Sequence, residues 1–358
     1  MAAPSKRLAP ALAGLAPYDP GFTPVDVLLS ANENSFGAPA DVRAAMTEAV
    51  AGLALNRYPD PMGNLLRDDL AAWHGVAREN VVVGNGGDEL LFNLMLAFGG
   101  EGRTLVDCPP TFSIYGLYAQ LTRTNVVRIM RDAETLDINY DAVKEAAATA
   151  DIVMLTTPNN PTGNLIDKAW IEELAASTDA LIVVDEAYVE FAGADATCIP
   201  LIERFENIAI LRTFSKAYGL AGVRCGYVIA SEDVINGMAA VRQVYSTDVC
   251  AQAIARVAAQ RHEEFQPIID LLCEERERLM AAFADMGEGV RAWPSAANFI
   301  LVRVPNGHEV YEAMRDEFSI LVRDFSRSAD LPDCLRITVG TPEENDRVIA
   351  ALKELVAR

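Results

Sequence analysis

The sequence has few cations and few histidines for its length. Its 358 residues contain 30 Lys and Arg against 51 Asp and Glu, which gives a formal net charge of −21, and they contain only three histidines. A surface this acidic repels phosphate backbones and anionic lipid headgroups, so we expect neither a nucleic-acid partner nor a membrane partner. His74, His262 and His308 are far apart in the sequence, so they provide little material for a histidine metal site or a Ser-His-Asp triad, and we expect no metal.

The sequence also lacks C-x-x-C pairs and long apolar runs. Its six cysteines are scattered, which is typical of free thiols in a reducing compartment. No window approaches the roughly 18 consecutive apolar residues that a membrane-spanning helix needs. Pro10 and Pro17 interrupt the short apolar run near the N-terminus, which we interpret as an extended arm and not as a signal peptide. These features together predict a cytoplasmic protein.

The length and the pattern of apolar segments predict two domains. A chain of 358 residues exceeds what one hydrophobic core usually serves. Short β-branched apolar runs at 81–83, 104–108, 126–130, 152–156, 180–184, 208–211 and 226–230 alternate with amphipathic stretches. This alternation predicts an α/β unit with a mainly parallel sheet between two helical layers. Strands expected at 298–304, 320–323 and 335–339, with helices at 308–317 and 343–356, indicate a smaller α+β unit.

The expected domain limits follow from this change of pattern. Residues 46–265 form the large domain, and residues 266–358 form the small C-terminal domain. Residues 1–45 form an N-terminal arm and part of the small domain, which would make that domain discontinuous.

Four polar segments come after predicted strands of the larger unit. They are residues 84–89, 158–163, 183–188 and 212–224. None matches G-x-G-x-x-G or the P-loop motif, which argues against a dinucleotide or nucleoside-triphosphate site. A glycine-rich turn that opens a helix still offers free backbone N–H groups to an anion. Because the carboxyl ends of parallel strands meet at one edge of a sheet, we expect the four segments to line one ligand site.

These segments together supply a nucleophile, an acid and a phosphate site. Lys216 follows an apolar strand, and its amine can form a Schiff base if burial or neighbouring cations lower its pKa. Asp185 ends an apolar strand, where a carboxylate is costly to bury without a cation such as a protonated ring nitrogen. The combination fits pyridoxal 5′-phosphate. Taken singly, each segment also fits a simpler role: a tight turn, a helix N-cap at Asp185, or a solvated lysine.

In this order and spacing, the segments resemble the fold-type-I, class-II pyridoxal-phosphate-dependent aminotransferases, and within them the histidinol-phosphate aminotransferase family. The resemblance extends over nearly the whole chain and includes Asn32-Glu33-Asn34 and the segments at 57–60, 109–112 and 335–340. It implies a large α/β/α domain and a smaller α+β domain. It also implies transamination between histidinol phosphate and 2-oxoglutarate in histidine biosynthesis, by a ping-pong mechanism with glutamate as the second donor.

The resemblance implies roles for residues around the cofactor ring. Lys216 would bind the cofactor as a Schiff base and then carry protons. Asp185 would keep the pyridine nitrogen protonated, while Asn160 and Tyr188 would hydrogen-bond the phenolic oxygen of the ring. Phe112 would stack on the ring, at a position where the family usually has tyrosine.

The resemblance also implies a phosphate site and a homodimer. Gly87, Asp88, Ser215 and Arg224 would hold the cofactor phosphate. Tyr58 would reach the cofactor phosphate of the neighbouring subunit, so the two active sites of a homodimer would share residues.

Substrate anions are assigned to arginines. The resemblance implies that Arg336 binds a carboxylate and that Arg323 is a second anion-binding residue, since a planar guanidinium suits a carboxylate and a phosphate alike. A strand-edge salt bridge is the alternative role for Arg323. Tyr18, Asn34 and Tyr245 fall near family positions that line the substrate.

Departures from the family pattern leave the substrate open. Ser35 stands where the family commonly has proline, and residues 244–248 differ from the usual segment. Asp248, if it faces the pocket, would attract an imidazole or repel a phosphate. The alternatives are an aminotransferase for aromatic or other amino acids, a pyridoxal-phosphate-dependent decarboxylase for a phosphorylated amino acid, and a non-catalytic binding protein. The presence of Lys216, Asp185 and Arg224 together argues against a non-catalytic binding protein.

Overall fold

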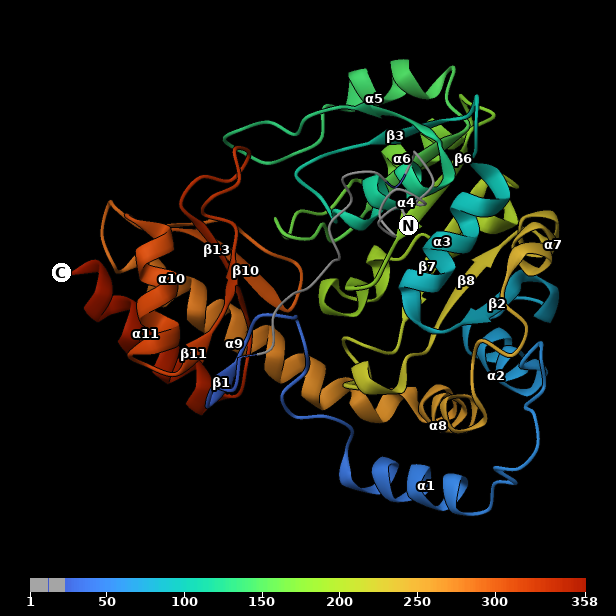
Figure 1. The fold of residues 1–358 in the computed structure, drawn as a ribbon, viewed down its shortest axis with the longest axis horizontal. Helices are drawn as coiled ribbons and strands as arrows, with labels where there is room; N and C mark the ends of the chain where they lie inside the picture. The colour runs from blue at the N-terminus through green and yellow to red at the C-terminus, as the bar shows by residue number, and fades with distance from the viewer. Residues whose placement is uncertain (1–11, 13–22) are drawn as a thin grey trace, which may run out of the picture.

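A seven-stranded sheet forms the centre of the larger unit in the computed structural model, which describes residue 12 and residues 23–358 (Figure 1). Its strands, in spatial order, are β2 (Val81–Gly84), β8 (Gly226–Ala230), β7 (Ile208–Thr213), β6 (Leu181–Asp185), β5 (Ile152–Thr156), β3 (Thr104–Asp107) and β4 (Asn125–Arg128). Only β8 runs antiparallel to its neighbours. All seven predicted strands are therefore confirmed, and so is the mainly parallel α/β fold.

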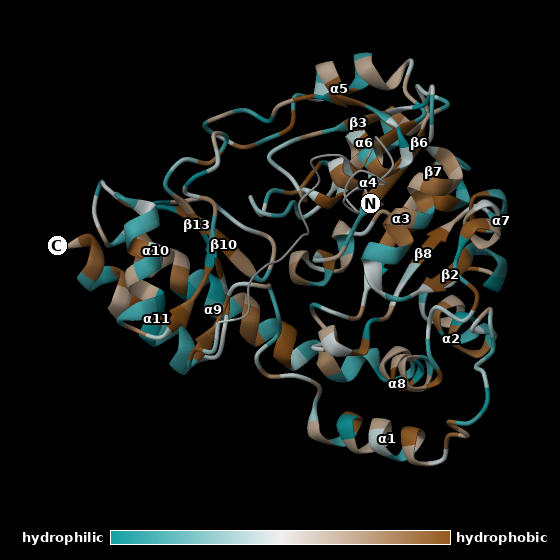
Figure 2. Ribbon diagram, viewed as in Figure 1, coloured by the Kyte–Doolittle hydropathy of each residue, from teal (hydrophilic) through white to brown (hydrophobic). Residues whose placement is uncertain are grey.

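Helices cover both faces of this sheet. One face packs against α3 (Gly86–Phe98), α4 (Ile114–Thr122) and α7 (Glu232–Val241). The other face packs against α2 (Asn64–His74), α5 (Tyr140–Ala147), α6 (Lys168–Ala175) and α8 (Val249–Gln260), and α1 (Ala40–Ala51) lies beside α8. Figure 2 shows hydrophobic residues along the central strands between these layers. Burial on both faces explains why most of the strands consist almost entirely of apolar residues.

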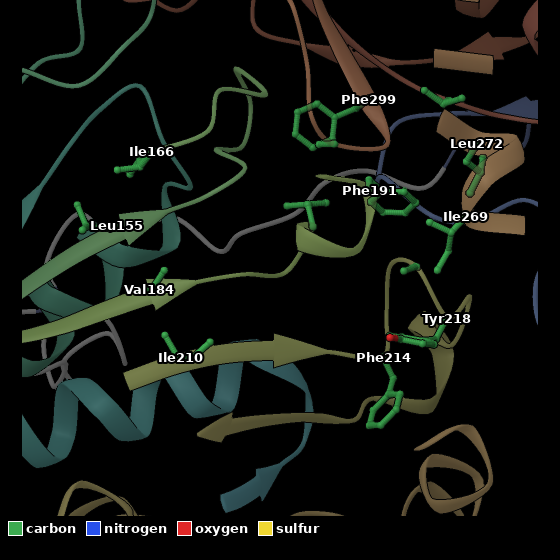
Figure 3. Close-up of a cluster of buried hydrophobic side chains, with 14 of the residues drawn as sticks. Leu155, Ile166, Val184, Phe191, Ile210, Phe214, Tyr218, Ile269, Leu272 and Phe299 are labelled. Carbon is green, nitrogen blue, oxygen red and sulfur yellow. The ribbon is translucent and has the colours of Figure 1, made fainter. Parts of the chain in front are cut away.

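A continuous hydrophobic core connects the large sheet to the rest of the molecule. Leu155, Val184 and Ile210 lie beside one another on β5, β6 and β7, and their side chains form a row on one face (Figure 3). The same cluster of buried residues continues through Phe191 to Phe299 of the second sheet. The two sheets therefore share one packed hydrophobic core.

The second sheet is antiparallel and has four strands. They are, in spatial order, β12 (Arg323–Asp324), β13 (Cys334–Thr338), β10 (Phe299–Arg303) and β9 (Arg291–Ala292). The accompanying helices are α9 (Gln266–Ala284), α10 (Gly307–Asp316) and α11 (Pro342–Val356). Thr341 and Glu344 form a reciprocal capping box at the start of α11, which satisfies two helix-end N–H groups.

The N-terminal segment packs beside the C-terminal part of the chain. β1 (Val27–Leu28) pairs in parallel with β11 (Ile320–Leu321). The single strand expected at 320–323 is therefore wrong: the chain changes partner at Val322, so that β11 pairs with β1 while β12 pairs with β13. The domain limits at residues 45 and 265 stay a prediction.

Short 3₁₀ helices complete the described secondary structure. They are η3 (Arg78–Asn80), η4 (Val189–Ala192), η5 (Ala194–Ala196), η6 (Ile199–Glu203), η7 (Ala221–Val223) and η8 (His262–Phe265). Within the residues that the structure describes, no helix has the length and apolar character needed to cross a membrane.

Candidate active site

A cavity of about 690 Å³ opens where β5, β6 and β7 end and the second sheet begins. Its floor includes the last residues of these parallel strands, and its wall includes β12, β13 and part of the segment 23–33. Eleven of the residues singled out from the sequence line it: Gly87, Asp88, Phe112, Asn160, Asp185, Tyr188, Ser215, Lys216, Arg224, Arg323 and Arg336. The expectation that the four polar segments meet at one edge of the sheet is confirmed.

Lys216 lies just beyond β7 and points into the cavity. Its Nζ donates a hydrogen bond to the carbonyl oxygen of Ala31 at 2.8 Å. Burial, and then the positive charge of Arg336, lower the pKa of the lysine to about 8. A lysine with this pKa holds a substantial neutral fraction near pH 7, which an amine needs in order to act as a nucleophile.

Asp185 ends β6 and is 4% exposed. Its Oδ2 accepts a hydrogen bond from the Tyr115 hydroxyl at 2.6 Å, and its Oδ1 accepts one from the Ala187 N–H at 3.0 Å. Burial raises the pKa of Asp185 to about 6, while these two bonds oppose the rise. No Lys, Arg or His among the described residues forms an ion pair with it. A buried carboxylate of this kind suits a cationic N–H group from a ligand.

The first turn of α3 and the loop after η7 bring together groups that suit an anion. Gly86 has a φ of +80°, which favours glycine, and a Cβ there would lie 2.5 Å from Nη2 of Arg224 and would displace the guanidinium from its place over the helix start. The same Nη2 lies 3.5 Å from Oδ2 of Asp88. Ser215 is buried nearby and hydrogen-bonds Thr213. Free N–H groups at a helix start beside an arginine suit a phosphate.

Two residues flank the space above Asp185. Tyr188 is 5% exposed, and its oxygen accepts a hydrogen bond from Asn32 Nδ2 at 3.0 Å. Phe112 lines the cavity and packs edge-on against Tyr115, with ring centroids 5.6 Å apart. A flat heteroaromatic ring between Phe112 and the floor, with its nitrogen at Asp185 and its phosphate at Arg224, fits these groups. The site therefore suits pyridoxal phosphate.

The wall opposite Lys216 carries two arginines. Arg323 and Arg336 are directly paired across β12 and β13. Arg336 donates to Asn160 Oδ1 and to the Ser30 carbonyl, both at 2.5 Å. Arg323 is half-buried and has no ion pair or hydrogen bond to any side chain that the structure describes. Two guanidinium groups on one wall repel each other, and an anion bound between them would offset that repulsion.

Three singled-out residues that the structure describes, Tyr58, Tyr245 and Asn34, do not line the cavity. Tyr58 is 81% exposed and stacks on Tyr245 at 4.5 Å between ring centroids, and neither lines the cavity. Asn34 is buried outside the lining, where its Nδ2 donates to the carbonyl oxygen of Ala217, next to Lys216. Tyr18 lies outside the described residues. Asp248, considered a possible pocket residue, caps α8 by accepting from two of its N–H groups.

Tyr115 and Asn32 are the residues that sequence reasoning missed. Tyr115 lies in the first turn of α4, three positions after Phe112, which precedes the helix. The feature of the sequence that could have identified Tyr115 is its hydroxyl in an otherwise apolar turn. Asn32 belongs to the Asn32-Glu33-Asn34 segment, but nothing in the sequence distinguishes which asparagine reaches the cavity.

Known proteins match this chain over most of its length. A family model described as aminotransferase class I and II matches residues 24–352. The histidinol-phosphate aminotransferase 1 of Carboxydothermus hydrogenoformans is 40% identical over 347 residues, which is 97% of each chain. Among solved structures, the histidinol-phosphate aminotransferase of Sinorhizobium meliloti in complex with pyridoxal-5′-phosphate has a TM-score of 0.87, 25% identity and 98% coverage of each chain. The L-threonine-O-3-phosphate decarboxylase of Porphyromonas gingivalis has a TM-score of 0.81 and 25% identity, covering 93% of this chain and 100% of that one.

Proposed function

The chain belongs to the aminotransferase class I and II family, and from this membership we propose that it transfers an amino group between histidinol phosphate and 2-oxoglutarate. It is a pyridoxal-phosphate-dependent aminotransferase. The choice of substrates rests on one observation: Arg323 and Arg336 are paired on the cavity wall. A pair of guanidinium groups suits both anions that such an enzyme must accept in turn, the phosphate ester of one donor and the carboxylates of the other.

The residues of the floor would hold the cofactor. Asp185 would bind the ring nitrogen, and Asn160 with Tyr188 would bind the phenolic oxygen. Four residues would bind the phosphate: Gly87, Asp88, Ser215 and Arg224. When bound, the cofactor supplies an electron sink for the carbon atom that carries the amino group.

Lys216 is the residue that moves protons. Its Nζ has a pKa lowered to about 8, so it can both take and return a proton near neutral pH. The hydrogen bond from Nζ to the Ala31 carbonyl keeps the amine at the cavity when it is not engaged with a ligand. Asp185, with a pKa raised to about 6 by burial, becomes a stronger acceptor for a ring N–H than a solvated aspartate would be.

We also propose a homodimer in which Tyr58 contributes to the partner's site. Tyr58 stacks on Tyr245 at the surface, and Leu55 and Leu65 nearby in sequence are 70% and 59% exposed. Large apolar side chains exposed together in this way are typical of an interface.

The proposed function is tested by a set of half-reactions. The pyridoxal form of the enzyme is mixed with histidinol phosphate, glutamate or phenylalanine, and conversion to the pyridoxamine form is followed by absorbance. We expect histidinol phosphate and glutamate to convert it. Conversion by phenylalanine but not by histidinol phosphate would assign an aromatic aminotransferase. Release of carbon dioxide from phosphothreonine without consumption of a keto acid would assign a decarboxylase.

A further inference from the structure

A chain of three hydrogen bonds connects the second sheet to Tyr188. The backbone N–H of Asn32 donates to Thr338 Oγ1 at 3.0 Å, and the Thr338 hydroxyl donates to Asn32 Oδ1 at 3.1 Å. Asn32 Nδ2 then donates to the Tyr188 oxygen at 3.0 Å. Asn32 and Thr338 are each 1% exposed, so water does not compete for these groups.

The backbone N–H of Asn32 sets the direction of the first bond, because it can only donate to Thr338 Oγ1. Thr338 Oγ1 keeps its own hydrogen, which it donates to Asn32 Oδ1. In this arrangement the oxygen of the Asn32 amide faces Thr338. The amide nitrogen therefore faces Tyr188, and because it can only donate, the Tyr188 oxygen accepts. The hydroxyl proton of Tyr188 is left free to point into the cavity.

The position of Asn32 couples this chain to other cavity residues. Thr338 lies two residues after Arg336 on β13, and Arg336 donates to the carbonyl oxygen of Ser30. The next carbonyl, that of Ala31, accepts from Lys216. The segment 30–32 thus contacts an arginine of the wall, the lysine nucleophile and Tyr188 in succession. Its backbone is held at Asn32, whose φ of +54° asparagine tolerates better than most residues.

We propose that Asn32 is a positioning residue which, with Thr338, aims the hydroxyl proton of Tyr188 at the phenolic oxygen of the cofactor ring. The inference rests on the proposed placement of that oxygen beside Tyr188. A donated proton lowers the basicity of the phenolic oxygen, so the pH at which the bound cofactor changes its absorbance reports whether the proton is delivered. Burial raises the pKa of Tyr188, which keeps its hydroxyl protonated and able to donate.

The charged groups that act on Tyr188 stay in place in the test. They are Arg336 on β13, Asp185 on β6, Asp88 on α3 and Lys216, whose Nζ lies 5.8 Å from the centre of the tyrosine ring. Tyr188→Phe, Thr338→Val and Thr338→Ser change none of them and add no charge, so a shift of the absorbance midpoint in these variants is attributable to the chain of hydrogen bonds. Asn32→Asp adds a carboxylate, so its shift also contains a direct electrostatic contribution.

The test compares the absorbance–pH midpoint of the bound cofactor in four single variants and one double variant of the holoenzyme. Asn32→Asp replaces the amide donor by a carboxylate that takes the Tyr188 proton, and aspartate also tolerates a positive φ. Thr338→Val keeps the shape of Thr338 but removes the hydroxyl that donates to Asn32 Oδ1, so the Asn32 amide is no longer held in one orientation. We expect Tyr188→Phe and Asn32→Asp to raise the midpoint by about one pH unit, as the loss of one hydrogen bond to a charged group predicts. Thr338→Val raises it less, and Thr338→Ser leaves it near the wild-type value.

The outcomes separate this inference from the proposed function. If Tyr188→Phe shifts the midpoint while Asn32→Asp and Thr338→Val do not, Asn32 does not position Tyr188 and the inference fails. If Tyr188→Phe itself causes no shift, the inference fails together with the placement of the ring. The double variant Thr338→Val/Tyr188→Phe should match Tyr188→Phe alone, and an additive shift would also contradict the inference. The half-reaction with histidinol phosphate tests the substrate proposal independently of these variants.

Discussion

The floor and the wall of the cavity differ in how their polar groups are satisfied. On the floor, Asp185 is held by Tyr115 and Ala187, and Ser215 is held by Thr213. On the wall, Arg323 has no hydrogen bond or ion pair to a side chain within the described residues. The floor is thus preorganised for a ligand that stays, whereas the wall keeps an arginine available for ligands that exchange.

The cavity and the rest of the surface also differ in charge. The described lining contains four cationic side chains, Lys216, Arg224, Arg323 and Arg336, against three acidic ones, Glu33, Asp88 and Asp185. The whole chain carries a formal charge of −21. An acidic protein can therefore bind anionic ligands, because the local groups that face the ligand outweigh a more distant and screened field.

The largest effect is expected on the floor, at Lys216. Lys216→Ala removes the group that carries the proton, so we expect the half-reaction rate to fall by at least about 100- to 10,000-fold. Rapid-mixing absorbance measures that rate. Lys353→Ala, which changes an exposed lysine on α11, is the matched control. A Lys216→Ala enzyme with the rate of the control would remove Lys216 from the chemistry.

The next largest effect is expected on the wall, and it should differ between the two arginines. Arg336 is buried and hydrogen-bonded, so Arg336→Ala should cost about 2–5 kcal/mol of transition-state binding, or roughly 30- to 5,000-fold in kcat/KM for glutamate. Arg323 is less buried, so Arg323→Ala should cost less. Steady-state kinetics give both values. Arg336→Lys keeps the charge without the planar fork, and an unchanged KM in Arg336→Ala would place the carboxylate elsewhere.

A smaller effect is expected where Tyr115 supports Asp185. Tyr115→Phe removes a donor to the carboxylate, so the pKa of Asp185 in the cofactor-free protein should rise above about 6. Because this folded-state pKa exceeds the unfolded one, Asp185 makes the cofactor-free protein lose stability as pH rises from about 4 to about 6. In Tyr115→Phe, the loss of folding stability should continue to higher pH. Denaturant unfolding at several pH values measures the free energy of unfolding of both proteins. Identical pH profiles would show that the bond does not tune Asp185.

The smallest effect is expected outside the cavity, at Tyr58. Tyr58→Phe keeps the stacking on Tyr245 and removes only the hydroxyl, so we expect cofactor affinity to weaken by roughly fivefold if that hydroxyl reaches the partner's phosphate. Tyr245→Phe is the control, since it changes the other ring of the stack. Fluorescence titration of the cofactor measures the affinity. A fully active monomer by light scattering would contradict the shared site.

The floor was predictable from the sequence because it is built from local patterns. Asp185 ends an apolar strand, and Lys216 and Asn160 each follow one within a few residues; parallel strands bring such positions to one edge. The supporting contacts were not predictable, because they join distant parts of the chain. Asn32 contacts Thr338, which lies 306 residues away in the sequence, and no local sequence pattern indicates a contact between residues so far apart. The same holds for Val322, where the chain leaves its pairing with β1, a strand almost 300 residues earlier, and pairs with β13.

The most direct test of the preorganised floor is to trap the cofactor on its lysine. The chain has five lysines: Lys6, Lys144, Lys168, Lys216 and Lys353. Borohydride reduces the carbon–nitrogen bond between cofactor and lysine, and mass spectrometry of the peptides then locates the label. We expect a single pyridoxyl group on Lys216. A label on any of the other four lysines, or none on Lys216, would contradict it.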